Sequence, residues 1–259
     1  MTLRRLSIAL LVLFAIVTIL SVFGEFIHIK IPGFAFTLTG FAFAMVHAGQ
    51  REGWKGALML AGLVFGVSLL FESVGVATGW VYGPYHYTDL LGEKFLGLVP
   101  YTIPVVWFLM SYPSFVIAEW LAWPGGEKNR TWRRVLSVAA VGGLVMTAWD
   151  VIMDPIMVAG GHWVWDADGA YFGIPLQNFW GWWLTVFTTY ALYMFLRRKV
   201  SRAAEAGFDR LALLAYLVTA FSTVTGALIN GRGDLALIGF FTMTPWVIMG
   251  WMKMGRHED

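Results

Sequence analysis

Long apolar runs make up most of this sequence, and they predict a membrane protein of about eight transmembrane helices. The runs lie at about residues 6–23, 31–47, 56–78, 96–123, 135–158, 179–196, 211–229 and 235–252. Most approach the roughly 20 apolar residues that a helix needs to cross a bilayer. No Gly/Ser-rich linker or low-complexity tract divides them. We therefore expect an all-α integral membrane protein in which residues 1–259 form a single transmembrane helical domain.

The first apolar run follows Arg4 and Arg5, as the apolar region of a cleaved signal peptide often does. It ends at Val22-Phe23-Gly24-Glu25, where no small-x-small cleavage site is present. We interpret this run as an uncleaved membrane anchor.

Lysine and arginine are distributed unevenly between the two ends of the predicted helices. If the N-terminus is cytoplasmic, the outer segments hold only three of the 18 basic residues, Lys30, Lys94 and Arg232. The inner segments hold Arg4, Arg5, Arg51, Lys55, Lys128, Arg130, Arg133, Arg134, Arg197, Arg198, Lys199, Arg202, Arg210, Lys253 and Arg256. Because cytoplasmic loops are enriched in basic residues, we expect both termini in the cytoplasm and the protein in the cytoplasmic membrane.

The composition narrows the functional classes further. The chain is 58% hydrophobic and 13% charged, and it has no cysteine. These values exclude intrinsic disorder, a disulfide scaffold and a thiolate metal site. The net charge of +2 is too small to indicate a nucleic-acid partner. The basic segment 197–210 is interpreted as a solvated cytoplasmic loop rather than a headgroup-binding or nucleic-acid-binding patch.

Three acidic residues lie inside predicted helices, where an ionisable group costs about 2.5–3.5 kcal/mol on insertion scales. Glu72 lies about six residues before the outer end of its helix. Asp150 and Asp154 share one helix face because they are four residues apart. Pro155 follows directly, so we expect the helix to kink or end there. Glu119 lies near an inner helix end and is expected only to snorkel to the interface.

Aromatic and titratable side chains are dense in the two long outer loops. One loop contains Trp80, Tyr82, Tyr85, His86, Tyr87 and Asp89, the other contains His162, Trp163, Trp165, Asp166, Asp168 and Tyr171, and the same side holds Glu25, His28, Gln177 and Asn178. An interfacial belt would explain single rings, and capping or surface roles would explain the histidines. Neither explains intramembrane acids at matching depth, although these acids could be structural hydrogen-bond acceptors. We favour an aromatic cavity and expect the polar chemistry to be concentrated in the outer half.

A short internal sequence similarity suggests that the helices carrying the acids and the two outer loops lie close together. Trp80-Val81-Tyr82 followed by Gly97-Leu98-Val99-Pro100 is similar to Trp163-Val164-Trp165 followed by Gly173-Ile174-Pro175. Each pair follows a helix with an acid in its outer half. We hypothesise that predicted helices 3–4 (56–78 and 96–123) and 5–6 (135–158 and 179–196) are parallel repeats about an axis along the membrane normal. This would place Glu72 opposite the two aspartates.

An acid pair in a dry aromatic pocket suits the protonation of an alkene. Burial and a second nearby carboxyl group favour retention of one proton at neutral pH. Trp and Tyr faces would stabilise the resulting carbocation, at about 2 kcal/mol for each desolvated contact. The second carboxylate, or His86 or His162, would then deprotonate the water that captures the cation.

Several motifs, in one order along residues 60–185, resemble a known family. They are Phe71-Glu72-Ser73-Val74-Gly75-Val76-Ala77-Thr78-Gly79, Tyr82-Gly83-Pro84-Tyr85-His86-Tyr87, Pro100-Tyr101-Thr102-Ile103-Pro104, Ala148-Trp149-Asp150 with Asp154-Pro155, and Gly173-Ile174-Pro175 with Asn178-Phe179. The chain thereby resembles the membrane-bound carotenoid biosynthesis proteins, which include carotenoid 1,2-hydratases and bisanhydrobacterioruberin hydratases.

The resemblance implies a hydro-lyase that adds water to the terminal double bond of an acyclic carotenoid end, without a redox cofactor or a metal. The implied partners are an acyclic carotenoid of the lycopene, γ-carotene or C50 type and the lipid bilayer, and other carotenoid enzymes remain open as partners. The residue roles are our own inference. Asp150 or Asp154 is expected to donate the proton and Glu72 to be its partner or the base. The expected substrate-binding residues are Trp80, Tyr82, Tyr85, His86, Trp149, His162, Trp163, Trp165 and Asn178.

Two other functions remain as alternatives. In a membrane prenyltransferase or cyclase, Asp150 and Asp154 would hold Mg²⁺ against a diphosphate, but such sites usually need basic residues, which the outer half almost lacks. A proton-coupled transporter would also use intramembrane carboxylates. Its route would have to be polar in both leaflets, and we expect few ionisable groups in the inner half. A retinal-binding photoreceptor is excluded because only Lys253, at the very end, is a candidate for the Schiff base.

Overall fold

The computed structural model describes residues 3–24, 26–122, 131–197 and 205–256. Six residues whose side of the membrane was predicted lie outside the described residues. They are Glu25, Lys128, Arg130, Arg198, Lys199 and Arg202. Residues 198–204, half of the segment 197–210, also lie outside them, so the interpretation of that half as a loop stays a prediction, whereas residues 206–210 are helical.

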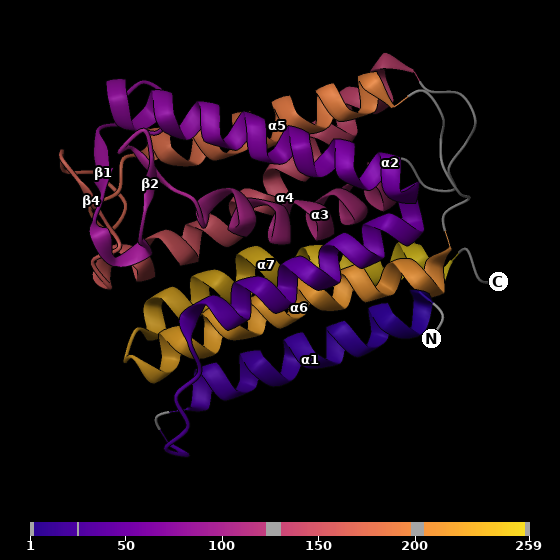
Figure 1. The fold of residues 1–259 in the computed structure, drawn as a ribbon, viewed down its shortest axis with the longest axis horizontal. Coiled ribbons are helices and arrows are strands. Elements are labelled where there is room, and N and C mark those ends of the chain that lie inside the picture. Colours follow the sequence, from indigo (N-terminus) through magenta and orange to yellow (C-terminus); the bar gives the residue numbers. More distant parts are fainter. Residues whose placement is uncertain (1–2, 25, 123–130, 198–204, 257–259) are drawn as a thin grey trace.

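Seven α-helices form the body of the described protein. They are α1 (Leu3–Phe23), α2 (Gly33–Thr78), α3 (Ile103–Ala122), α4 (Trp132–Ala159), α5 (Leu176–Leu196), α6 (Ala206–Ile229) and α7 (Gly233–Gly255). All except α5 are long and apolar enough to cross a membrane, and α5 is less hydropathic because it is rich in Trp, Tyr and Thr. The helices lie side by side in one bundle (Figure 1). The prediction of an all-α, multi-pass membrane protein is therefore confirmed.

Helix α2 contains two antiparallel arms, which correspond to two of the predicted runs. It has 46 residues, which at 1.5 Å per residue is roughly twice the thickness of a hydrocarbon core. Gly53 interrupts it with φ 73° and ψ 154°, a conformation that is essentially restricted to glycine. The chain reverses at this point (Figure 1). With this kink, the seven helices contain eight segments near the predicted positions.

One predicted helix boundary is wrong. Residues 96–102 were expected to be helical, but β2 (Lys94–Phe95) and β3 (Val99–Pro100) pair as an antiparallel hairpin before α3 begins. Leu96 and Gly97 have φ values of 51° and 72°, which a right-handed helix does not allow. In α4, by contrast, Pro155 lies inside the helix, which ends about one turn later at Ala159.

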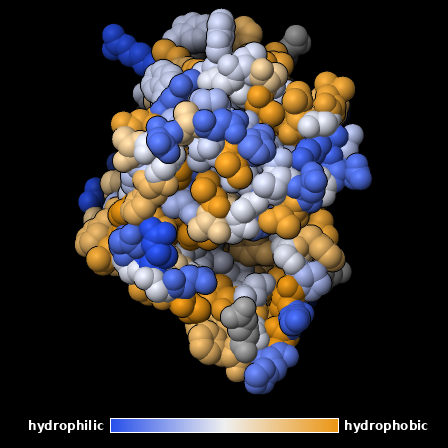
Figure 2. Space-filling model, turned by 90° about the vertical axis from the view of Figure 1, so that its left-hand side faces the viewer, coloured by the Kyte–Doolittle hydropathy of each residue, from blue (hydrophilic) through white to orange (hydrophobic). Residues whose placement is uncertain are grey.

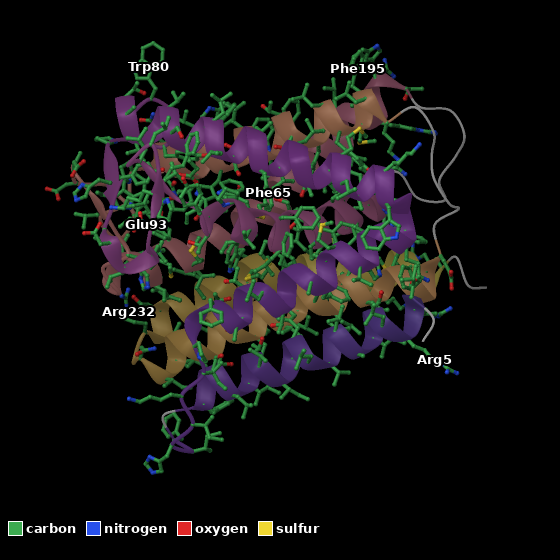
Figure 3. The ribbon with its side chains drawn as sticks, viewed as in Figure 1. Arg5, Phe65, Trp80, Glu93, Phe195 and Arg232 are labelled. Carbon is green, nitrogen blue, oxygen red and sulfur yellow. The ribbon has the colours of Figure 1, made fainter. Side chains whose placement is uncertain are left out.

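The two ends of the bundle carry different elements. Helix α1 begins and α7 ends at one end, whereas β1 (Tyr85–Tyr87), β2 and β4 (Trp163–Trp165) lie at the other (Figure 1). Arg5 and Arg232 mark these opposite ends in Figure 3. We call them the terminal end and the strand end. Which end faces the cytoplasm stays a prediction.

The expectation that polar chemistry is concentrated at the strand end is wrong. A buried ionic cluster near the terminal end joins the kink of α2 to α3, α5 and α6. In it, Arg51 contacts Glu52 and Glu119 at 2.6 Å each and Asp209 at 2.8 Å, and Arg197 contacts Glu52 at 3.0 Å. Glu119 therefore does not snorkel, because its charge is paired inside the protein. This removes the premise on which the transporter alternative was disfavoured.

The pairing of the strands differs from the alignment that the internal sequence similarity suggested. Strand β4 pairs antiparallel with β1, so that Tyr85 lies opposite Trp165 and Tyr87 opposite Trp163. The segment that pairs with residues 163–165 is therefore 85–87, whereas the sequence similarity aligned residues 80–82 with them. The repeat itself stays a prediction.

Candidate active site

A large cavity lies at the strand end of the bundle. Its volume is about 860 Å³, within the usual range for small-molecule sites. Helices α2 to α5 and the loops that carry β1 and β4 supply its walls, and a hollow is visible on this end of the molecule (Figure 2). The lining includes Glu72, Tyr82, Tyr85, Tyr87, Trp107, Trp149, Asp154, His162, Trp163, Trp165, Asn178 and Trp182. Acids on two different helices therefore line one cavity.

Strand β1 selects which of its side chains enter the cavity. Successive side chains of a strand point to opposite faces. Tyr85 and Tyr87 are accordingly buried against the cavity, whereas His86 between them is exposed. The pairing with β4 fixes this register and brings Trp163 and Trp165 beside the tyrosines. A short two-stranded ribbon thus closes the strand end over the acids.

Glu72 accepts three hydrogen bonds and is only 3% exposed. The Tyr85 hydroxyl donates to its Oε2, the Tyr87 hydroxyl donates to the same oxygen at 2.9 Å, and Trp107 Nε1 donates to Oε1 at 3.0 Å. Burial and the adjacent Glu72 carboxyl raise the pKa of Tyr85 and of Tyr87 well above the usual range, so both phenols remain donors. Three donors favour the carboxylate form of the acid that they contact, whereas burial favours its neutral form.

Asp150 and Asp154 form a buried pair that is joined by one amide. Asn178 Nδ2 lies 2.8 Å from Asp150 Oδ2 and 2.7 Å from Asp154 Oδ2, so the NH₂ group donates one bond to each carboxyl. Trp163 Nε1 donates to Asp154 Oδ1 at 2.6 Å. Two neighbouring carboxylates repel each other when both are ionised, so such a pair tends to hold one proton between them.

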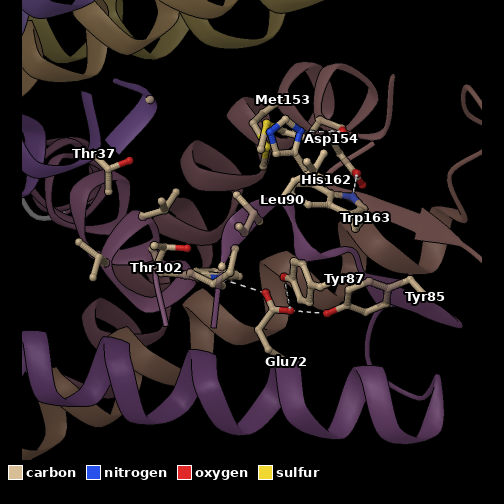
Figure 4. A pocket seen from close by; sticks show the side chains of 18 of the residues that line it. Thr37, Glu72, Tyr85, Tyr87, Leu90, Thr102, Met153, Asp154, His162 and Trp163 are labelled. Atoms are coloured by element: carbon tan, nitrogen blue, oxygen red, sulfur yellow. Dashed lines mark hydrogen bonds between the residues drawn. The ribbon is translucent and has the colours of Figure 1, made fainter. Parts of the chain in front are cut away.

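The two acidic groups are connected through aromatic rings. Tyr87, which donates to Glu72, packs edge-on against Trp163, which donates to Asp154, with ring centroids 5.8 Å apart. Figure 4 shows both hydrogen-bonded groups on the wall of the same cavity. Glu72 and Asp154 thus line one cavity, and the catalytic roles predicted for them and for Asp150 stay predictions.

The deep wall of the cavity is formed by stacked indoles. Trp107 and Trp182 are stacked with centroids 4.1 Å apart, and Trp149 packs edge-on against Trp182 at 6.0 Å. Tyr82 is also buried, and its hydroxyl lies 2.8 Å from Thr185 Oγ1. Electron-rich ring faces at such a wall are suited to stabilising a cation.

Most of the predicted site residues line this cavity, but three do not. Trp80 is 82% exposed, because it follows the left-handed Gly79 at the end of α2 and projects away from the bundle (Figure 3). His86 points to the outer face of β1, where its Nδ1 lies 2.8 Å from Asp166 Oδ1. Asp150 is fully buried behind the cavity wall and contacts the site through Asn178. The prediction that Trp80 and His86 line the cavity is therefore wrong.

Sequence reasoning missed several lining residues. Trp182 lies four residues after Asn178 and hence on the same face of α5, so helical spacing could have found it. Tyr87 shares the parity of Tyr85, but this signal requires the knowledge that 85–87 is a strand. Trp107 approaches Glu72 only through the packing of α3 on α2. Spacing within α3 carries no signal of that contact.

The mouth of the cavity is apolar and exposed. Its exposed lining residues come from the start of α2 and from the segment 90–102, and they include Phe34, Leu38 and Leu90, which are 64%, 53% and 66% exposed. The residues around Glu72, Trp149 and Asn178 are buried. The cavity thus runs from an apolar mouth to a polar interior, which is the arrangement expected for a long apolar ligand with a reactive end.

Comparison with known proteins identifies the family. A model of the carotenoid biosynthesis protein family matches residues 32–245. The chain belongs to this family. This confirms the resemblance found in the sequence, and the matched region includes every helix that lines the cavity.

One curated relative has a stated activity. The chain is 34% identical over 142 residues to a protein of Haloarcula japonica named bisanhydrobacterioruberin hydratase. The match covers 55% of this chain and 42% of that relative, so the chain spans less than half the length of the protein that it matches. No solved structure matches the chain significantly.

Proposed function

We propose that this protein is a carotenoid hydratase of the cytoplasmic membrane, which adds water to the terminal double bond of an acyclic carotenoid end. The observation that carries the proposal is the joint placement of Glu72 and the Asp150–Asp154 pair around one aromatic, apolar-mouthed cavity. Membership of the carotenoid biosynthesis family supports a polyene substrate, and the name of the relative supports hydration.

The proposed reaction begins with proton transfer from the aspartate pair. Asp154, which lines the cavity, gives its proton to the CH carbon of the terminal alkene, and the π electrons form the new C–H bond. Positive charge develops at the tertiary carbon, where the faces of Trp107 and Trp182 are available to stabilise it. General-acid catalysis of this kind contributes about 10²- to 10⁴-fold to a rate.

Water then captures the cation. A lone pair of the water oxygen forms the C–O bond, and the proton that is released passes to the Glu72 carboxylate. Transfer of that proton through water back to the aspartate pair restores the site. The net reaction consumes one water for each end, changes no oxidation state and needs no redox cofactor. The product is a tertiary alcohol.

The composition of the cavity disfavours diphosphate chemistry. Among the described residues that line it, none is a lysine or an arginine. A prenyltransferase would need such groups or metal ions against the phosphates. For the transporter alternative, membership of a biosynthetic family favours chemistry on a polyene over ion transport.

The decisive experiment is expression of the chain in a host that accumulates lycopene and has no hydratase of its own. Mass measurement of the extracted pigments should show a gain of one water for each modified end. A matched strain that expresses the Asp154→Asn variant provides the control. Addition of an isoprenoid unit would instead identify a prenyltransferase, and unchanged pigment would refute activity on lycopene-type ends.

A further inference from the structure

A buried donor in the deep wall of the cavity has no partner in the protein. The indole Nε1 of Trp149 makes no hydrogen bond among the described residues, although the side chain is only 4% exposed. A buried donor that is left unsatisfied costs about 1–3 kcal/mol. Native proteins therefore place such groups where water or a ligand supplies the acceptor.

The surroundings of Trp149 indicate what that acceptor is. Trp149, Met153 and Met157 line the cavity at successive turns of α4, and Asp154 lies on the same side of the helix. The ring is held edge-on against Trp182, which fixes its plane. Asp150 Oδ1, on the adjacent residue, is also buried and without a partner among the described residues. The unpartnered donor thus lines the cavity, and an unpartnered acceptor lies on the next residue, behind the cavity wall.

We propose that Trp149 Nε1 is an oxygen-binding donor, which holds the attacking water before the reaction and the tertiary hydroxyl of the product afterwards. This inference rests on the proposed hydration and deepens it. A water oxygen has two lone pairs, so it accepts from the indole with one and attacks the cation with the other. After the C–O bond forms, the same oxygen accepts from the same N–H. Trp149 is then a residue that distinguishes the hydrated end from the alkene end.

The test compares the binding of two ligands to wild-type protein and to the Trp149→Phe variant. Lycopene carries alkenes at both ends, and its doubly hydrated derivative carries tertiary alcohols. Dissociation constants are measured in detergent by quenching of protein fluorescence, which requires no turnover. We expect the variant to weaken binding of the dihydroxy compound about 3- to 10-fold more than binding of lycopene, the equivalent of one neutral hydrogen bond.

Two further variants test whether the effect is specific to the N–H group of Trp149. The matched control is Trp183→Phe. In the wild-type protein the Trp183 N–H donates to the Ala140 carbonyl at 3.1 Å, so its loss should leave the ratio of the two dissociation constants unchanged. Replacement of Trp149 by 3-benzothienylalanine exchanges N–H for sulfur and preserves the shape of the ring. It should reproduce the loss even if the phenylalanine variant folds poorly.

Each outcome decides the proposal. Equal loss for both ligands in both Trp149 variants would show that the ring contributes only packing and would overturn the inference. An unchanged ratio would also overturn it, while leaving the proposed hydratase function intact. If wild-type protein bound neither ligand, the proposed carotenoid function itself would fail, together with this inference.

Discussion

At the residue scale, the acids of the site differ in the groups that contact them. Glu72 receives donors only, from two phenols and one indole. The aspartate pair has a single bridging amide and, at Asp154, one indole. The first arrangement suits a carboxylate that acts as base, and the second suits a pair that keeps a proton. This difference in partners, rather than in residue type, is the support for the two proposed roles.

The role of the aspartate pair leads to the first prediction at this scale. Asp154→Asn keeps the size of the side chain and removes the acid, so hydration of an acyclic carotenoid should fall by about 10²- to 10⁴-fold. The measurement is the rate of product formation by purified protein in detergent. Asp168→Asn is the matched control, because Asp168 is exposed and is not part of the cavity wall. Equal rates for Asp154→Asn and wild type would refute its role as proton donor.

The residue scale also shows what the sequence could and could not predict about the site. Glu72, Asp150 and Asp154 could be found because a carboxyl group inside an apolar run is unusual, wherever its partners lie. Trp80 and His86 were placed in the cavity wrongly, since composition alone does not show which way a loop side chain points. Only the pairing of β1 with β4 decides that Tyr85 faces inward and His86 outward.

At the element scale, the reversal of α2 at Gly53 determines which helices meet. It places the second arm of α2 next to α3, where Glu72 contacts Trp107. The positive φ of Gly53 suits glycine, and an added Cβ would meet no atom within 4 Å. Gly53→Ala should therefore destabilise the protein by about 1–3 kcal/mol through backbone strain alone. Thermal unfolding in detergent measures the effect.

Gly62→Ala on the same helix is the control for this prediction. Its added Cβ would also meet no atom within 4 Å, but its backbone is helical. Alanine there should be neutral or stabilise the protein by roughly 0.5–1 kcal/mol. If both variants lost the same stability, the reversal would not depend on the conformation of Gly53.

The helices were predicted more accurately than the strands, for a physical reason. Helix positions followed from the lengths of apolar runs, because the bilayer imposes that length on any sequence. The ribbon of β1 and β4 and the hairpin of β2 and β3 lie at the strand end, outside the long helices, where no such constraint applies. The cluster of Arg51, Glu52 and Glu119 was misinterpreted because counting charges assigns Arg51 to a loop, whereas its guanidinium is paired inside the bundle.

At the scale of the whole molecule, the cavity has an exposed apolar mouth and a buried polar interior. A long polyene could therefore insert one end while the rest of the chain stays in an apolar environment. Leu38, on the first arm of α2, lines the mouth and is 53% exposed, whereas the stacked indoles of Trp107 and Trp182 are buried. A larger side chain at this position would narrow the entry without touching the acids. Loading of the substrate, rather than the chemical step, should then be slowed.

We therefore expect Leu38→Trp to raise KM for an acyclic carotenoid roughly 3- to 10-fold, which corresponds to about 0.7–1.4 kcal/mol, and to leave kcat close to wild type. Leu58→Trp is the matched control, because Leu58 lies on the same helix, is 60% exposed and is not part of the cavity wall. It should leave both constants unchanged. Steady-state kinetics with substrate in mixed micelles separates the two constants. A fall in kcat with constant KM would place Leu38 near the reacting end, and equal effects of both variants would show that the substrate does not enter at this mouth.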